Sequence, residues 1–211
     1  MAMRKKNIFS ALLSLFLLVP ASITWAQTIS SQKGLTTAVF TTSAGIIKVY
    51  LPDDIRPGDL ISGRVIAEPE GRNEKQLARS LAELTTYSIR FNGEKFTVDN
   101  VAKTFQFSLP SGQPMQGSMD LMKAAGTNTV QQLVIPVKPP GEQKSAPAQC
   151  MIPGHVLSGS PMTISGPFDG NAANTQCTIG KQPANILAES PRSCIVAFPS
   201  DANGMQETKI I

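Results

Sequence analysis

The dipeptide Asn92-Gly93 lies between two short runs in which apolar and polar residues alternate, residues 87–91 and 95–98. Asn-Gly between such runs favours a two-residue turn with positive φ, whose twist matches that of two antiparallel strands. The predicted register places nearly all apolar side chains on one face, as expected for a half-buried hairpin. The facing pairs are Tyr87 and Val98, Ile89 and Phe96, Arg90 and Lys95, and Phe91 and Glu94.

Similar short runs recur along the chain and predict an all-β protein. The alternation is cleanest at Phe105, Phe107 and Leu109, where the intervening residues are polar. The polar segment 27–34 is expected to be a flexible lead-in. The strands predicted in the first part of the chain cover residues 38–41, 45–51, 60–67, 87–91, 95–98, 104–109 and 133–137.

One helix is predicted among these strands, over residues 74–84. Asn73 is a suitable N-cap, and Leu77, Leu81 and Leu84 recur at the spacing of one helical face. We expect this leucine face to pack on a sheet rather than to bind a partner.

The segment 139–148 begins with Pro-Pro-Gly and continues with small and polar residues, which is typical of a linker. It divides the chain into a β-sandwich domain, residues 36–138, and a second domain, residues 149–211. The Pro-Gly pattern of residues 57–63 recurs in residues 153–159. This echo fits either two tandem β domains or a chance likeness of turn residues.

Residues 1–26 have the order of a secretory signal peptide. Arg4, Lys5 and Lys6 precede an apolar core at residues 11–19, and Pro20 and small residues follow. Cleavage after Ala26 is expected. The alternative is an uncleaved membrane anchor, because residues 8–26 approach the ~20 residues of a spanning helix.

Removal of the signal changes the charge of the protein. Three of its 19 basic side chains lie in the signal, which leaves 16 against 15 acidic ones and a net charge of +1. A nearly neutral exported chain lacks the basic surface of a nucleic-acid-binding protein. The only tryptophan, Trp25, is also lost, which weakens the case for carbohydrate binding.

From Pro153 onward, turn glycines alternate with short apolar strands: Gly159, Met162-Thr163-Ile164, Gly166, Phe168, Cys177-Thr178-Ile179-Gly180, Ala184, Ile195-Val196-Ala197-Phe198-Pro199 and Gly204. The order of these residues resembles that of an IPT/TIG domain. The resemblance covers about 55 of the 211 residues. It implies an immunoglobulin-like sandwich that serves as a spacer or adhesive surface. The expected fold is therefore two immunoglobulin-like β-sandwich modules in tandem, with one short helix in the first, and the first part resembles secreted bacterial β-sandwich proteins.

Three cysteines in an exported chain suggest one disulfide and one remaining thiol. Cys177 and Cys194 fall in predicted strands of the same module, so we expect them to pair. That bridge would stabilise the module by about 3 kcal/mol. Cys150 is the alternative partner for either one.

No catalytic constellation is visible in the sequence. The single histidine, His155, lies in a turn without a nucleophile motif beside it. Asp53, Asp54 and Asp59 could offer oxygens to calcium from one loop, but they lack calcium-loop spacing and are expected to be solvated turn residues. A second oxygen-rich turn, 169–174, is explained by backbone chemistry alone. No metal or cofactor site is expected.

The sequence therefore predicts an exported, non-catalytic protein, secreted, periplasmic or at the cell surface. It would bind, adhere or support through its loops and exposed strand edges. The expected partner is a protein or a cell-surface polymer, not nucleic acid, and no membrane insertion is expected after cleavage. Two alternatives remain: the accessory domains, or a divergent form, of an extracellular polymer-degrading hydrolase, and a membrane-tethered assembly subunit.

Overall fold

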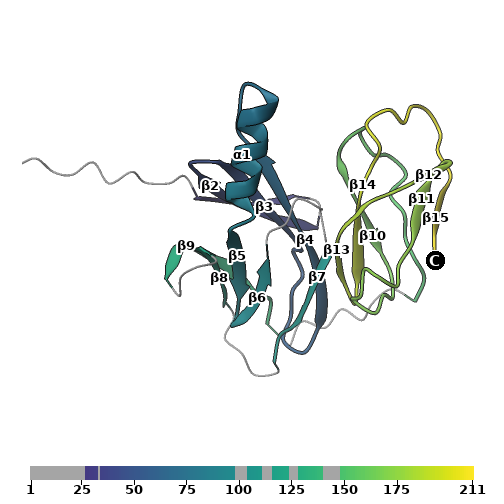
Figure 1. The fold of residues 1–211 in the computed structure, drawn as a ribbon. Coiled ribbons are helices and arrows are strands. Elements are labelled where there is room, and N and C mark those ends of the chain that lie inside the picture. Colours follow the sequence, from purple (N-terminus) through teal and green to yellow (C-terminus); the bar gives the residue numbers. More distant parts are fainter. Residues whose placement is uncertain (1–26, 33, 98–103, 111–115, 124–127, 140–147) are drawn as a thin grey trace, which may run out of the picture.

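The computed structural model describes residues 27–32, 34–97, 104–110, 116–123, 128–139 and 148–211. These residues form antiparallel sheets and a single helix, so the predicted all-β class is confirmed (Figure 1). The predicted signal peptide and most of the predicted linker lie outside the described residues. We refer below to residues 27–139 as the N-terminal region and to residues 148–211 as the C-terminal region.

The first four strands form a meander in the order of the chain: β1 (Gln27–Gln32), β2 (Leu35–Thr42), β3 (Gly45–Pro52) and β4 (Leu60–Pro69). β7 (Thr104–Ser108) pairs with the first half of β4. The expectation of a flexible lead-in at residues 27–34 was wrong, because β1 pairs along its whole length with β2. Polar side chains are compatible with this position, since β1 is a terminal strand of the sheet.

The helix α1 (Glu74–Leu84) follows β4 and confirms the predicted bounds. The Asn73 side chain accepts a hydrogen bond from the Gln76 N–H at 2.9 Å, as an N-cap should. The leucine face is only partly buried: Leu84 is fully buried, whereas Leu77 is 38% exposed. The helix therefore covers the sheet with its last turn and projects from it with its first (Figure 1).

A second sheet has the order β6-β5-β8-β9. The predicted hairpin forms one end of this sheet, with β5 (Tyr87–Phe91) and β6 (Glu94–Thr97) in the expected register from Ile89–Phe96 to Phe91–Glu94. Asn92 and Gly93 have φ of 46° and 96°, which the two-residue turn requires. β9 (Thr129–Pro136) extends a predicted strand, but β8 (Gln116–Lys123), which contains Gly117, Ser118 and two Met and no β-branched residue, was not predicted.

The two sheets of the N-terminal region pack face to face around one hydrophobic cluster. Phe40, Ile47 and Ile61 come from the first sheet, and Ile89 and Leu121 come from the second; all five are fully buried. Burial of each Ile, Leu or Phe side chain in this cluster stabilises the folded state by about 1.5–3 kcal/mol, relative to leaving it exposed to water.

The C-terminal region adds strands to the first sheet and builds a small sheet of its own. β13 (Ile186–Ser190), β14 (Ser193–Ala197) and β10 (Pro161–Ser165) continue the first sheet beyond β4. β11 (Cys177–Ile179) lies between β12 (Gln182–Pro183) and β15 (Thr208–Ile210) in the small sheet. A second hydrophobic cluster, which includes Ile164, Ile179 and Val196, fills the space between these strands.

The two regions are in direct contact. β13 meets β4 where Glu189 pairs with Ser62, and Leu35 of β2 packs with Leu187, Ala188 and Ile195 in a third cluster. Figure 1 shows β13 next to β4 and the other C-terminal strands beyond it. The repeated Pro-Gly pattern does not repeat a structure, because residues 60–63 lie in β4 whereas residues 156–159 lie in no strand.

Candidate binding groove

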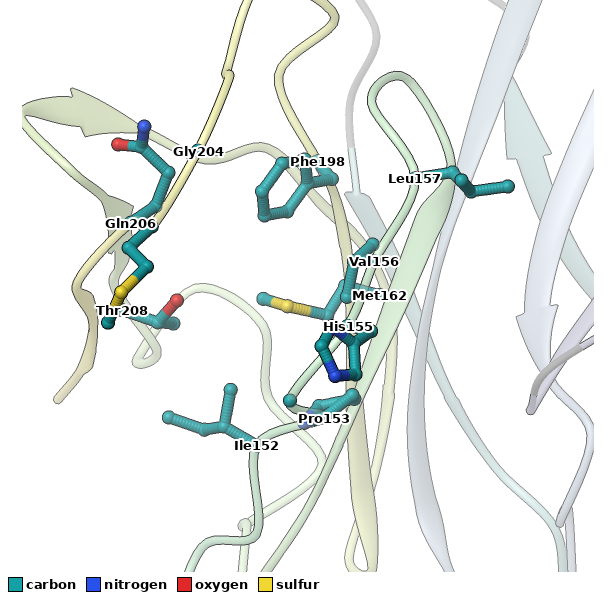
Figure 2. A pocket seen from close by; sticks show the side chains of 12 residues that line it. Ile152, Pro153, His155, Val156, Leu157, Met162, Phe198, Gly204, Gln206 and Thr208 are labelled. Atoms are coloured by element: carbon teal, nitrogen blue, oxygen red, sulfur yellow. The ribbon is translucent and has the colours of Figure 1, made fainter.

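An open groove of about 700 Å³ lies at the free side of the C-terminal region (Figure 2). One wall is the segment 152–157 together with Met162 of β10. The other wall is formed by residues 204–206 and Thr208 of β15, and Phe198 lies at one end. The groove therefore lies between the terminal strands of two different sheets.

Two hydrogen bonds join the loops beside the groove, and a third stabilises one of these loops internally. The Ser158 hydroxyl donates to the Ala202 carbonyl at 2.6 Å, and the Phe198 N–H donates to the Ser160 carbonyl at 3.1 Å. The Gln206 side-chain amide donates to the Asn203 carbonyl at 2.7 Å. These bonds position two loops that are far apart in the chain on either side of one opening.

The lining is mostly apolar, with polar side chains at His155, Gln206 and Thr208. Figure 2 shows Met162, Phe198 and Val156 directed into the opening, whereas Leu157 points away from it. None of the lining residues is Asp, Glu, Lys or Arg. Several apolar side chains around the groove are exposed: Met205 fully, Leu157 by 72% and Ile152 by 42%. Exposed apolar side chains gathered in one place are typical of a surface that contacts another molecule.

His155 lies on the rim of the groove and is exposed. Among the residues that the structure describes, no hydrogen bond involves its side chain. A general base is normally oriented by such a bond.

The three aspartates considered for calcium have other partners. The Arg192 guanidinium binds the Asp54 carboxylate, with Nε 3.0 Å from Oδ2, and also binds the Asp59 carboxylate through Nη1 and Nη2. The Asp53 carboxylate oxygen Oδ1 lies 3.9 Å from the Lys138 Nζ. The expectation of solvated turn residues was wrong for Asp54 and Asp59, since both are largely buried by this contact between the two regions.

All three cysteines are free thiols in this structure, so the predicted Cys177–Cys194 disulfide is not formed in it. The two do share one hydrophobic cluster, as residues of the same group of strands. Burial raises the pKa of both thiols, which keeps them protonated. Cys150 is exposed.

Sequence reasoning missed Glu189, which is fully buried in β13. Within the described structure neither of its carboxylate oxygens has a hydrogen-bond partner. Burial, and then the negative charge of Asp169, raise the pKa of Glu189, while hydrogen bonding to Asn174 and Asn171 lowers the pKa of Asp169. The available signal was a glutamate directly after the apolar run Ile186-Leu187-Ala188.

No family model and no curated protein matches the chain. In the described residues no group of three or more His, Cys, Asp or Glu side chains is placed to hold a metal ion. None of the described helices has the length and apolar character that crossing a membrane requires.

Proposed function

We propose that this protein is an exported, non-catalytic binding protein that holds an extended apolar segment of a partner polypeptide in the groove of its C-terminal region. The observation that carries the proposal is the groove between β10 and β15, which has no acidic or basic lining residue apart from His155 and has the exposed Met205 and Ile152 side chains beside it. Export is part of the proposal and is supported by the signal-like order of residues 1–26.

The free edge of β15 favours an extended occupant. Ile211 and Gln176 exchange two main-chain hydrogen bonds, at 2.9 and 3.0 Å, and the Gly180 N–H donates to the Glu207 carbonyl at 2.7 Å. Because every second residue of an antiparallel strand bonds to a given neighbour, the N–H and C=O groups of Thr208 and Ile210 point away from β11. A partner strand that added to this edge would bond to those groups.

The lining of the groove determines the chemistry of that partner. A charged side chain entering this space would lose water without gaining an opposite charge, since the lining residues carry none. Apolar side chains gain by the same transfer, at about 25 cal/mol per Å² of surface removed from water. The occupant is therefore an uncharged strand whose alternate side chains are apolar.

The wider architecture is also part of this proposal. The C-terminal region is an IPT/TIG-like sandwich whose open side is the groove, and the N-terminal region is an immunoglobulin-like sandwich that supports it. The separate hydrophobic clusters of the two regions support this division.

A pair of synthetic peptides tests strand addition directly. The first is an end-capped, fluorescently labelled peptide of alternating valine and threonine, and the second has the same side chains but N-methylated amides. We expect the first to bind with an anisotropy change and the second to bind at least tenfold more weakly, because methylation removes the donors that pair with β15. Equal binding of both peptides would contradict strand addition.

Two matched variants locate the binding. Met205→Asp places a charge beside the groove at a fully exposed position, and Val134→Asp does the same at a 51% exposed valine of β9. We expect Met205→Asp to weaken peptide binding tenfold or more, which corresponds to about 1.4 kcal/mol, and Val134→Asp to leave it unchanged. The opposite pattern would place the binding site elsewhere.

A further inference from the structure

A buried acidic pair lies where the two regions meet, away from the groove. Glu189 is fully buried, and both of its carboxylate oxygens lack a hydrogen-bond partner in the described structure. Arg192, three residues further along the chain, is held by Asp54 and Asp59 instead. The described residues include no ion pair to Glu189, and a buried carboxylate without an opposite charge is strongly disfavoured.

Asp169 is brought to this position by the loop between β10 and β11. Glu189 pairs with Ser62 of β4, and the Ser62 hydroxyl donates to the Gly170 carbonyl at 2.7 Å and accepts from the Ala172 N–H at 3.0 Å. Ser62 thus fixes the loop beside Glu189. A second carboxylate lies in that loop, next to Gly170.

The Asp169 carboxylate is held in one orientation. Its Oδ1 accepts from the Asn171 N–H at 2.7 Å, and its Oδ2 accepts from the Asn174 side-chain amide at 2.6 Å. The pKa values of the two carboxyl groups shift in opposite directions, down for Asp169 and up for Glu189, partly because each acts on the other. The Thr175 side chain makes no hydrogen bond of normal length and angle to Glu189 in the described structure, but it is near enough to lower the pKa of Glu189.

We infer that Glu189, Asp169 and the Thr175 hydroxyl form a calcium-binding site between the loop and β13. Carboxylate and hydroxyl oxygens are the donors that Ca²⁺ accepts in flexible geometry, with water completing its 6–8 ligands. Mg²⁺ fits less well because it demands a regular octahedron. A bound cation supplies the positive charge that Glu189 lacks. Asp169 is exposed, so the ion has a route from solvent.

The neighbouring Cys194 thiol does not make this a zinc site. Its pKa is raised, first by burial and then by the Glu189 charge, so the thiolate that zinc requires is disfavoured. The expected affinity is that of extracellular calcium modules, with a Kd of about 10⁻⁴–10⁻³ M. This inference does not depend on the groove or on its occupant.

Equilibrium dialysis of the whole protein with radioactive Ca²⁺ at neutral pH tests the site. We expect one ion per chain in the wild type, and thermal unfolding should shift upward by roughly 3–5 °C at ten times Kd. Glu189→Gln keeps the shape of the side chain but removes its charge, and should abolish both effects. Asp169→Asn is a second variant at an exposed position, for use if Glu189→Gln does not fold.

Asp120→Asn is the matched control, since Asp120 lies on β8 in the N-terminal region, where its carboxylate accepts from Ser118. Calcium binding that this control retains and that both site variants lose supports the proposal. A wild type that takes up no Ca²⁺ at millimolar concentration overturns it, as does a Glu189→Gln protein that binds like the wild type. In either of those cases the pair shares a proton instead of an ion.

Discussion

Arg192 Nε lies 3.0 Å from Asp54 Oδ2, although the two residues are 138 positions apart in the chain. The same guanidinium also binds Asp59, and its Nη2 donates to the Asp54 carbonyl at 2.9 Å. The side chains of Arg192 and of both aspartates are at most 16% exposed. One side chain of the C-terminal region is therefore bound at three points by a single loop of the N-terminal region.

Replacement of Arg192 by Gln should destabilise the protein by about 3 kcal/mol, because it leaves two largely buried carboxylates without their cation. Urea unfolding measures this loss. Lys48→Gln is the matched comparison: its ion pair with Glu68 is short, at 2.7 Å, but both side chains are substantially exposed. That change should cost less than about 1 kcal/mol. Similar losses for the two variants would mean that the Arg192 contact contributes no more than a surface pair.

The raised pKa of Glu189 should make the free energy of unfolding depend on pH. Its pKa is raised in the folded protein, so the folded state holds a proton that the unfolded state has lost. Stability is therefore greatest at low pH for this group and falls as pH rises from the ordinary glutamate pKa of 4.5 toward the folded value. The groups that face Glu189 are Asp169, Cys194 and Thr175, and none of them is basic.

Glu189→Gln should remove that decline. Measured in a calcium chelator, the free energy of unfolding of the wild type should fall more steeply with pH than that of the variant, by up to about 1.4 kcal/mol per pH unit. Asp169 acts in the opposite sense, since its lowered pKa adds stability that is lost as pH falls below 3.8. Parallel curves for the wild type and Glu189→Gln would show that Glu189 has an ordinary pKa.

The thiols should differ in reactivity. Cys150 is exposed, whereas Cys177 and Cys194 are buried with raised pKa values. A thiol reagent added to the folded, reduced protein should modify Cys150 at once and the other two only after denaturation. Rapid modification of all three thiols in the folded state would contradict the burial of this pair. Peptide mapping without reduction of exported protein tests the predicted disulfide between them.

Two glycines with positive φ should respond differently to alanine. Gly93 has open space where a Cβ would be added, so Gly93→Ala should cost only the backbone strain, about 1 kcal/mol. At Gly170 the added Cβ would lie 2.0 Å from the Leu60 carbonyl oxygen. Gly170→Ala must therefore displace the loop that Ser62 holds, and should cost well over 3 kcal/mol by thermal or urea unfolding. Equal effects would mean that this loop moves freely.

Local rules predicted the features that depend on neighbours in the chain. The Asn92-Gly93 turn fixed the register of its hairpin, and the Asn73 cap fixed the start of the helix. Both involve residues within a few positions of each other, so their geometry is encoded in a short segment. The partly exposed Leu77 marks the limit, because helical spacing predicts a common face but not how far a sheet extends beneath it.

The contacts between the two regions could not be predicted in this way. Nothing near Asp54 or Asp59 in the sequence indicates that an arginine far along the chain will bind them. From the sequence alone, Glu189 would be taken for a surface residue. In the fold β13 lies between β4 and β14, so the surroundings of Glu189 are apolar and acidic. The groove depends on the same arrangement, since its walls come from two sheets whose order the sequence does not state.

The pairing of β13 with β4 also bears on the order in which the protein folds. Chains emerge from the ribosome N-terminus first, so the N-terminal region is present before Arg192, which follows Asp54 by 138 residues. Until the C-terminal region has been made, Leu35 lacks its contacts with β13 and β14, and Ser62 lacks its pairing with Glu189. A partly synthesised chain therefore exposes a surface of β2 and β4 that β13 and β14 cover only when they follow.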